Sequence, residues 1–312
     1  MSLRVICCSH TPLLHHLRPP GGVQAAVRDA FAGLADAVRA FDPELIVVFS
    51  PDHYNGFFYD VLPPFCVGAA ATAVDDFGTG GGPLNVPADD ALSLVQALQA
   101  AELDAALSYR MAVDHGVAQP LHLLTGGLER YPVIPLFVNC VARPAPSCRR
   151  VRQLGAAVGR WAAGLERRVL LVGSGGLSHS PGLPDFFAAS ARTREHLIGG
   201  RGADPAAMRK REAAIIERAR GYVTGELTPP PLNEAWDRAF LDLLGRGELA
   251  AVDEFADDWI TAEGGPGGHE IRTWIAAFAA LAAAGPYRMV VDYYRPVPEW
   301  VAGMGLVQAM PA

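Results

Sequence analysis

The sequence predicts an α/β protein with three layers, α/β/α, a mixed, partly parallel central sheet and a helix-rich C-terminal half. Two observations predict this fold class. Short runs of apolar residues alternate with longer segments in which apolar residues recur at helical spacing, as in successive βαβ units. Half of the 312 residues are apolar, so the chain can bury the core that a sheet covered on both faces requires.

The first βαβ unit lies at the N-terminus. Leu3–Cys8 is predicted to be a buried strand, because all but one of its residues are apolar. From Val23 to Phe41 apolar residues recur every three or four positions, which predicts an amphipathic helix. Pro43 ends that helix, since proline lacks the backbone N–H that a helix needs, and Leu45–Ser50 is predicted to be the next strand.

The same alternation continues through the middle of the chain. We expect a helix over Pro87–Ala101, strands over Leu103–Tyr109 and Val133–Val138, a helix over Val151–Leu165 and a strand over Val169–Gly173.

The segment from about residue 186 to residue 284 is predicted to be mainly helical. Polar breaks that contain glycine and proline interrupt it, and we interpret it as a helical half rather than an independent domain. We therefore expect it to pack on the sheet, so that residues 1–312 form a single domain.

Composition limits the possible partners and compartment. A net charge of -7 and the lack of a dense basic block argue against a nucleic-acid partner. We find neither a signal peptide nor an apolar run of the about 18 residues that a membrane span needs, so no membrane role is expected. The five cysteines form no C-x-x-C pair, and their odd number is unlike a disulfide framework. These features predict a cytoplasmic protein.

Three histidines each follow a predicted strand. His10, His53 and His179 come just after Leu3–Cys8, Leu45–Ser50 and Val169–Gly173. In an open parallel sheet, ligands bind beyond the carboxyl ends of the strands, so these side chains should meet in one pocket. For His10 alone, an ordinary polar residue at a strand end is an equally good interpretation.

The loop around His53 adds a carboxylate and aromatic residues. Asp52 could orient a metal-binding His53, although adjacent side chains often point apart and the carboxylate can come from elsewhere. Asn55 and Gly56 are a typical turn pair. The aromatic residues Phe57–Tyr59 are expected in the core rather than around a substrate.

Two of the candidate histidines lie in turn-like segments. His115, between Asp114 and Gly116, could equally be part of a surface turn. His179 ends the segment Gly173–His179, whose three glycines allow a close approach of backbone and ligand. This segment lacks the endings of a phosphate-binding loop and the spacing of a serine-hydrolase elbow.

Glu270 is the candidate carboxylate ligand. It opens the last long predicted helix, where an acidic side chain is favourable beside the helix dipole even without a metal. Glu263 is another acidic candidate nearby.

Several segments together resemble the class III extradiol ring-cleaving dioxygenases, from the first strand to about Gly305. They are the Ser9–Leu13 block with His10, Pro51–Val61, Val113–Gly116, Gly173–His179, His269–Trp274 and Tyr293–Trp300.

The resemblance implies one catalytic domain with an Fe(II) cofactor held by His10, His53 and Glu270. Such a facial triad leaves coordination positions open for substrate and oxygen. It also implies His179 as general base and His115 as general acid, roles that suit a side chain whose pKa is about 6.5. The histidines His15, His16, His122 and His196 fall outside the family pattern and are expected to be ordinary polar residues.

The implied partners are a small-molecule catechol substrate and O2. Within the family, the closest pattern implies 3-(2,3-dihydroxyphenyl)propionate or 2,3-dihydroxycinnamate, with ring opening of the former to 2-hydroxy-6-oxonona-2,4-dienedioate. Arg295 is one possible partner for the substrate carboxylate. Relatives of this kind suggest a homo-oligomer such as a tetramer. The alternatives are a related dioxygenase with another catechol or zinc, and a binding protein without activity on the same fold.

Overall fold

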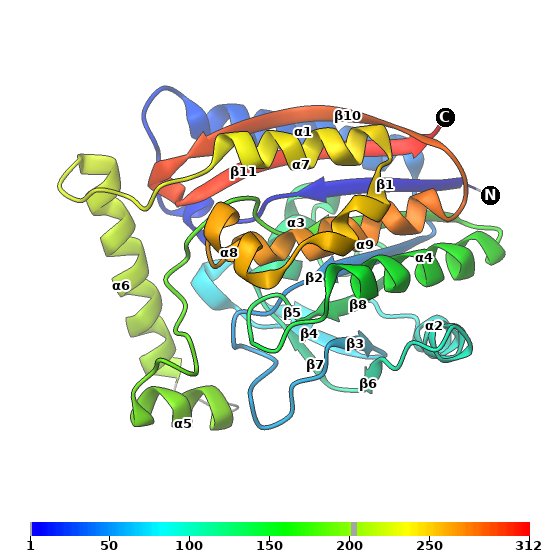
Figure 1. The fold of residues 1–312 in the computed structure, drawn as a ribbon, viewed down its shortest axis with the longest axis horizontal. Coiled ribbons are helices and arrows are strands. Elements are labelled where there is room, and N and C mark those ends of the chain that lie inside the picture. The colour runs from blue at the N-terminus through cyan, green and yellow to red at the C-terminus, as the bar shows by residue number, and fades with distance from the viewer. Residues whose placement is uncertain (1, 201–204) are drawn as a thin grey trace.

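The middle layer of the molecule is an eight-stranded mixed sheet. The computed structural model describes residues 2–200 and 205–312 (Figure 1). The strand order is β10-β11-β1-β9-β2-β8-β3-β6. The four central strands β1, β9, β2 and β8 are parallel to one another, whereas β11 and β3 run antiparallel to their neighbours β1 and β8. The bounds are β1 Ser2–Cys8, β2 Leu45–Ser50, β3 Phe65–Gly68, β6 Ala106–Ser108, β8 Val133–Val138, β9 Arg168–Ser174, β10 Tyr287–Val297 and β11 Ala302–Pro311.

Alternating side chains of the central strands feed two hydrophobic cores. In β1, Val5 and Cys7 belong to one core, and Ile6 and Cys8 belong to the other. This follows from the strand period of two, which sends successive side chains to opposite faces of the sheet. Because both faces are covered by helices, the central strands are mostly apolar and buried, as the sequence predicts.

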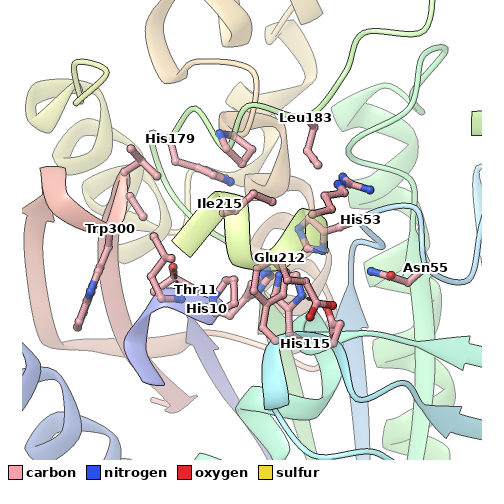
Figure 2. A pocket seen from close by; sticks show the side chains of 18 of the residues that line it. His10, Thr11, His53, Asn55, His115, His179, Leu183, Glu212, Ile215 and Trp300 are labelled. Carbon is pink, nitrogen blue, oxygen red and sulfur yellow. Dashed lines mark hydrogen bonds and ion pairs between the residues drawn. The ribbon is translucent and has the colours of Figure 1, made fainter. Parts of the chain in front are cut away.

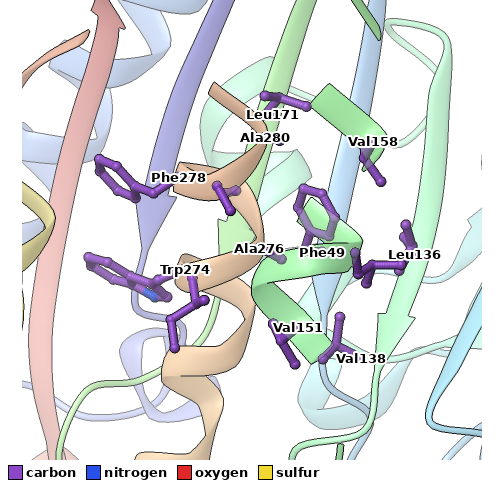
Figure 3. Close-up of a cluster of buried hydrophobic side chains, with 14 of the residues drawn as sticks. Phe49, Leu136, Val138, Val151, Val158, Leu171, Trp274, Ala276, Phe278 and Ala280 are labelled. Carbon is purple, nitrogen blue, oxygen red and sulfur yellow. The ribbon is translucent and has the colours of Figure 1, made fainter. Parts of the chain in front are cut away.

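Helices form the two outer layers. One core includes residues of α2, α4, α7 and α9, and the other includes residues of α1 and α3. Figure 3 shows Phe49, Leu136 and Val138 of the sheet beneath side chains of α4 and α9. The bounds are α1 Val23–Phe41, α2 Ala88–Ala100, α3 His115–Thr125, α4 Cys148–Gly164, α5 Ala191–Gly199, α6 Pro205–Thr224, α7 Glu234–Arg246, α8 Asp257–Gly264 and α9 Ile271–Ala282.

Helices α5 and α6 extend beyond one end of the sheet, on the side toward which β1 runs (Figure 1). Helix α6 contacts two short 3-10 helices, η2 (Asp76–Gly78) and η5 (Pro298–Trp300). A second, three-stranded sheet consists of β5 (Gly82–Pro83), β4 (Ala71–Ala73) and β7 (Met111–Val113). The remaining 3-10 helices are η1 (Pro12–His15), η3 (Leu249–Glu254) and η4 (Gly268–Glu270).

The three-layer fold class predicted from the sequence is confirmed, with differences in its elements, among them the short strands β3, β4, β5 and β7, which the sequence analysis did not identify. The strand expected over Leu103–Tyr109 is reduced to β6, because the chain only leaves helix α2 at Ala101 and turns again after Ser108. The predicted helix-rich C-terminal half closes with two long strands, β10 and β11, that the sequence analysis did not identify. Many β10 side chains are exposed or half-buried, so this edge strand lacks the apolar run used to find the others.

Throughout the described chain, we find no helix long and apolar enough to cross a membrane.

Candidate active site

Strands β1, β2 and β9 lie side by side and end at the same edge of the sheet. Cys8 of β1 is paired with Ser174 of β9, and Phe49 of β2 is paired with Gly173 of β9. The three strands therefore end at the same level of the sheet. His10, His53 and His179 follow these ends, and all three line one cavity of about 850 Å³ that opens to solvent (Figure 2). His115 and Glu270 line the same cavity. All five residues that the sequence analysis singled out are therefore brought together.

Glu270 lies at the centre of this group. Its Oε1 atom is 3.2 Å from Nε2 of His53 and 3.2 Å from Nε2 of His179, and its Oε2 atom is 3.8 Å from Nε2 of His10. The side chain is 1% exposed. A buried carboxylate is costly unless charge and hydrogen bonds compensate it. Burial raises the pKa of Glu270, but His179, His53 and His10 outweigh this effect and hold the pKa well below its usual value.

The backbone around Glu270 directs its side chain to the histidines. Glu270 ends the 3-10 helix η4 and immediately precedes α9. Its side chain makes no capping hydrogen bond to α9, and its Oε2 accepts the backbone N–H of Gly176 at 2.7 Å. The Glu270 carboxylate is therefore directed to the histidines and to Gly176 rather than to the first N–H groups of α9.

His10 presents one ring nitrogen to the centre of the site. Its Nδ1 is 2.9 Å from Oγ of Ser174, which fixes the ring and leaves Nε2 facing Glu270. Burial lowers the pKa of His10 to about 3. The ring is therefore neutral at physiological pH and keeps a lone pair for a metal.

Asp114 is the residue that orients His53. Its Oδ2 atom is 3.0 Å from Nδ1 of His53 and accepts the backbone N–H of the same residue at 2.7 Å. Asn55 also donates to this oxygen, at 3.0 Å. Burial lowers the pKa of His53, but Asp114 and Glu270 outweigh it and the net shift is upward. A histidine bonded through its second nitrogen to a carboxylate is typical of metal sites.

Asp52 has a different role from the one considered in the sequence analysis. Its carboxylate accepts the backbone N–H groups of Asn55, Gly56 and Phe57 and so shapes the loop after His53. Gly56 is needed here for space, because a Cβ atom would lie 2.2 Å from the Ala112 carbonyl oxygen. The loop is thus held by Asp52 while its histidine is oriented by Asp114.

His115 is not in a surface turn, which corrects one of the alternatives above. It is the first residue of helix α3 and is 5% exposed. Its Nδ1 atom forms a short hydrogen bond with the carboxylate of Asp76, and its ring stacks on His53 with centroids 4.4 Å apart. Asp76 was missed by the sequence analysis, because it follows β4, a three-residue strand without a long apolar run, and lies in no recognisable motif.

Glycines make room for His179. A Cβ atom on Gly267 would lie 2.2 Å from Nε2 of His179, and one on Gly176 would lie 2.7 Å from Cε1 of the same ring. The Nδ1 atom of His179 is 2.9 Å from the Leu177 carbonyl oxygen. The close approach predicted for the glycine segment is therefore found, and it involves the protein's own imidazole.

The donor set fits a divalent transition metal. The nitrogens of His10, His53 and His115 lie within 4.8 Å of one another, and the Glu270 carboxylate faces two of these rings. Imidazole and carboxylate ligands are the set preferred by iron and its neighbours. Beside His10 and His53, the geometry allows either Glu270 or His115 as the third ligand.

Other residues discussed above lie away from the cavity. Phe58 is buried in a small apolar cluster, and Phe57 stacks on Phe137 with centroids 3.9 Å apart. Arg211 is the only arginine among the described residues that line the cavity. Arg295, considered above as a partner of the substrate carboxylate, does not line it. Of the histidines outside the family pattern, His15, His16 and His196 are exposed. His122 is half-buried in α3.

Comparison with known proteins agrees with this site. Residues 4–305 match the family described as the catalytic LigB subunit of aromatic ring-opening dioxygenases. The chain belongs to this family, and it is an extradiol dioxygenase. A metal-dependent enzyme of this class accounts for the convergence of histidines and a carboxylate.

Particular relatives are similar over their whole length. The chain is 54% identical over 312 residues, 100% of this chain and 99% of the relative, to the 2,3-dihydroxyphenylpropionate/2,3-dihydroxicinnamic acid 1,2-dioxygenase of Cupriavidus pinatubonensis. It is 46% identical over 310 residues, 99% of each chain, to the protein of the same name from Rhodococcus jostii. A crystal structure of an uncharacterised protein from Escherichia coli K12 shares the fold, with a TM-score of 0.52, 17% identity and 98% of each chain covered.

Proposed function

We propose that this enzyme uses O2 to open the ring of 3-(2,3-dihydroxyphenyl)propionate, giving 2-hydroxy-6-oxonona-2,4-dienedioate, and that it also accepts 2,3-dihydroxycinnamate. The observation that carries the proposal is the convergence of four imidazoles and one buried carboxylate in a single open cavity. The names of the relatives support this choice of substrate. The cavity also opens to solvent, so a small substrate can reach the histidines from outside.

We further propose that the metal is Fe(II) and that His10, His53 and Glu270 hold it. The Nε2 atoms of both histidines face the Glu270 carboxylate, and the other nitrogen of each ring is already hydrogen-bonded. Bound iron would supply Lewis acidity toward a catechol and one-electron chemistry toward O2.

His179 is assigned as the general base that takes a catechol proton. The Leu177 carbonyl can only accept a hydrogen bond, so Nδ1 of His179 carries a proton. Its Nε2 atom is then the one that gains and loses a proton beside Glu270. Removing a catechol proton increases the electron density of the ring that reacts with oxygen.

His115 is assigned as the general acid that returns a proton during ring opening. Its Nδ1 atom donates to the Asp76 carboxylate, which leaves Nε2 free to donate to a reacting oxygen. A positioned acid or base contributes about 10²- to 10⁴-fold in rate.

The first test is anaerobic reconstitution with Fe(II), followed by addition of O2 and 3-(2,3-dihydroxyphenyl)propionate. We expect one O2 consumed for each molecule of yellow ring-opened product. Bound iron without turnover of this catechol would disprove the substrate, and activity on another catechol in a panel would identify the alternative. Failure to bind Fe(II) would disprove the assignment of iron. Activity of the zinc-loaded protein would assign zinc instead.

The same assay tests the residue assignments. We expect His10→Ala to lose iron, and His115→Gln or His179→Gln to keep iron and lose about 10²- to 10⁴-fold in turnover. Loss of iron in His115→Gln together with retained iron in Glu270→Gln would transfer the ligand role to His115.

We also propose that residues 1–312 work as one catalytic domain in a cytoplasmic homo-oligomer, such as a tetramer. Support comes from the pairing of β1 with β11, which joins the two ends of the chain, and from five buried free cysteines, which suit a reducing compartment. The edge strand β10 exposes Val290 and Val291, which a neighbouring copy could cover. Light scattering during size-exclusion chromatography measures the mass of the assembly, and cell fractionation measures its compartment.

A further inference from the structure

The active-site cavity has an uneven distribution of charge. Asp76, Glu212 and Glu270 line it with carboxylates, and Arg211 is the only lysine or arginine among its described lining residues. Histidines face Glu270 and Asp76 inside the site, so a substrate carboxylate that lies away from them needs another cation. The substrate proposed above carries a carboxylate on its side chain, so the position of Arg211 bears directly on its recognition.

Arg211 lies on the face of α6 that is turned to the cavity. The lining residues of this helix are Met208, Arg211, Glu212 and Ile215, a spacing of three, four and seven positions that defines one helix face. Figure 2 shows Glu212 and Ile215 over the same cavity as His10 and His53. The helix also contacts η2, which carries Asp76, so its position is tied to the wall of the site.

The charge of Arg211 is not neutralised by a bonded carboxylate among the described residues. Its guanidinium makes neither a hydrogen bond nor an ion pair with them, whereas Arg220 on the same helix pairs with Glu217 at 3.5 Å. Neighbouring protein still removes water from it: burial lowers the pKa of Arg211, while Glu212 and Tyr54 act in the opposite direction. The residue is exposed as a whole, so it stands at the mouth of the cavity, where a ligand can reach it.

We infer that Arg211 binds the side-chain carboxylate of the substrate and thereby selects carboxylated catechols. A guanidinium and a carboxylate fit each other through two parallel hydrogen bonds, and such charged bonds are stronger than neutral ones. This inference rests on the proposed function and adds the residue that determines its substrate class. The catechol ring would lie among the histidines while its side chain extends toward α6.

The test compares two substrates in the iron-loaded enzyme, 3-(2,3-dihydroxyphenyl)propionate and the uncharged 3-propylcatechol. In Arg211→Gln we expect the ratio of kcat/KM for the acid to kcat/KM for the neutral catechol to fall about 10- to 100-fold, as loss of a charged hydrogen bond predicts. The change should appear mainly as a higher KM for the acid. Arg211→Lys, which keeps the charge but loses the paired geometry, should retain part of the preference.

Arg209→Gln is the matched control, since Arg209 lies on the same helix, is exposed and does not line the cavity. It should keep the wild-type ratio. An unchanged ratio in Arg211→Gln would overturn the inference, as would an equal fall in Arg209→Gln. Loss of preference in Arg143→Gln instead would assign the carboxylate to the adjacent cavity that Arg143 lines.

Failure of the proposed function gives a different result. A wild-type enzyme that cleaves neither catechol would disprove the proposed function before Arg211 is tested. A wild-type enzyme that cleaves 3-propylcatechol at least as well as the acid would leave ring cleavage intact and overturn the role of Arg211.

Discussion

At the scale of single residues, the site is built from imidazoles whose outer nitrogens are already occupied. Ser174, Asp114 and Asp76 bond Nδ1 of His10, His53 and His115, respectively. Each bond fixes the rotation of a ring and leaves its Nε2 atom for the cavity. Losing such an outer contact typically costs about 10- to 100-fold in metal affinity or activity.

Asp114→Asn should weaken metal binding. An amide can still occupy the same space, but it no longer provides the negative charge that faces His53 and fixes its orientation. We expect iron affinity to fall about 10- to 100-fold, as for similar contacts in other metal sites. The measurement is competition for Fe(II) with a chelator under anaerobic conditions.

The control for this change is Asp104→Asn, which alters an exposed carboxylate outside the cavity. Equal iron affinity in Asp114→Asn and wild type would contradict the orienting role. Asp52→Asn distinguishes the roles of the two aspartates. It disturbs the hydrogen bonds within the loop but leaves the contact between Asp114 and His53 in place.

At the scale of elements, helices α4 and α9 pack closely against each other. A Cβ atom on Gly155 would lie 2.2 Å from the Ala276 carbonyl oxygen, and one on Gly159 would lie 2.0 Å from that of Ala280. Small residues on both helices therefore bring their backbones together above the sheet (Figure 3). Helix α9 follows Glu270 directly, so this packing also positions the central carboxylate.

Gly159→Ala should destabilise the protein although alanine favours helices. The new methyl group meets backbone rather than a movable side chain, and overpacking of this kind costs about 1–3 kcal/mol. Gly164→Ala on the same helix is the control, because no atom lies within 4 Å of its added Cβ. Urea denaturation measures both, and equal stabilities of the two variants would show that α4 and α9 can separate without cost.

At the scale of the whole molecule, the site joins segments from both ends of the chain. His10 follows the first strand, and Glu270 precedes the last long helix. A metal that holds both residues stabilises the folded chain, since an unfolded chain does not keep its ligands together. Metal binding should therefore be visible in global stability as well as in activity.

Fe(II) at about 100 times its Kd should add about 2.7 kcal/mol to the free energy of unfolding and raise the Tm. We expect this rise to be largely lost in Glu270→Gln. The control is Glu263→Gln, which changes an exposed carboxylate bonded to Asn233. Anaerobic calorimetry with and without metal measures the shift, and a shift lost in Glu263→Gln but kept in Glu270→Gln would reject Glu270 as a ligand.

The sequence by itself determined the layers of the fold and the meeting of three histidines. Apolar runs and helical spacing are local patterns, and they located the four parallel strands in the middle of the sheet. Because parallel strands end at one edge, the positions of His10, His53 and His179 in the chain implied that they meet in space.

Only the tertiary structure decided which groups surround these histidines. Asp114 rather than Asp52 orients His53, Asp76 bonds His115, and Arg211 stands at the mouth of the cavity. These residues come from loops and from a helix whose paths depend on packing with distant parts of the chain. Local spacing specifies where a strand ends, whereas the partner of a side chain depends on contacts between residues far apart in sequence.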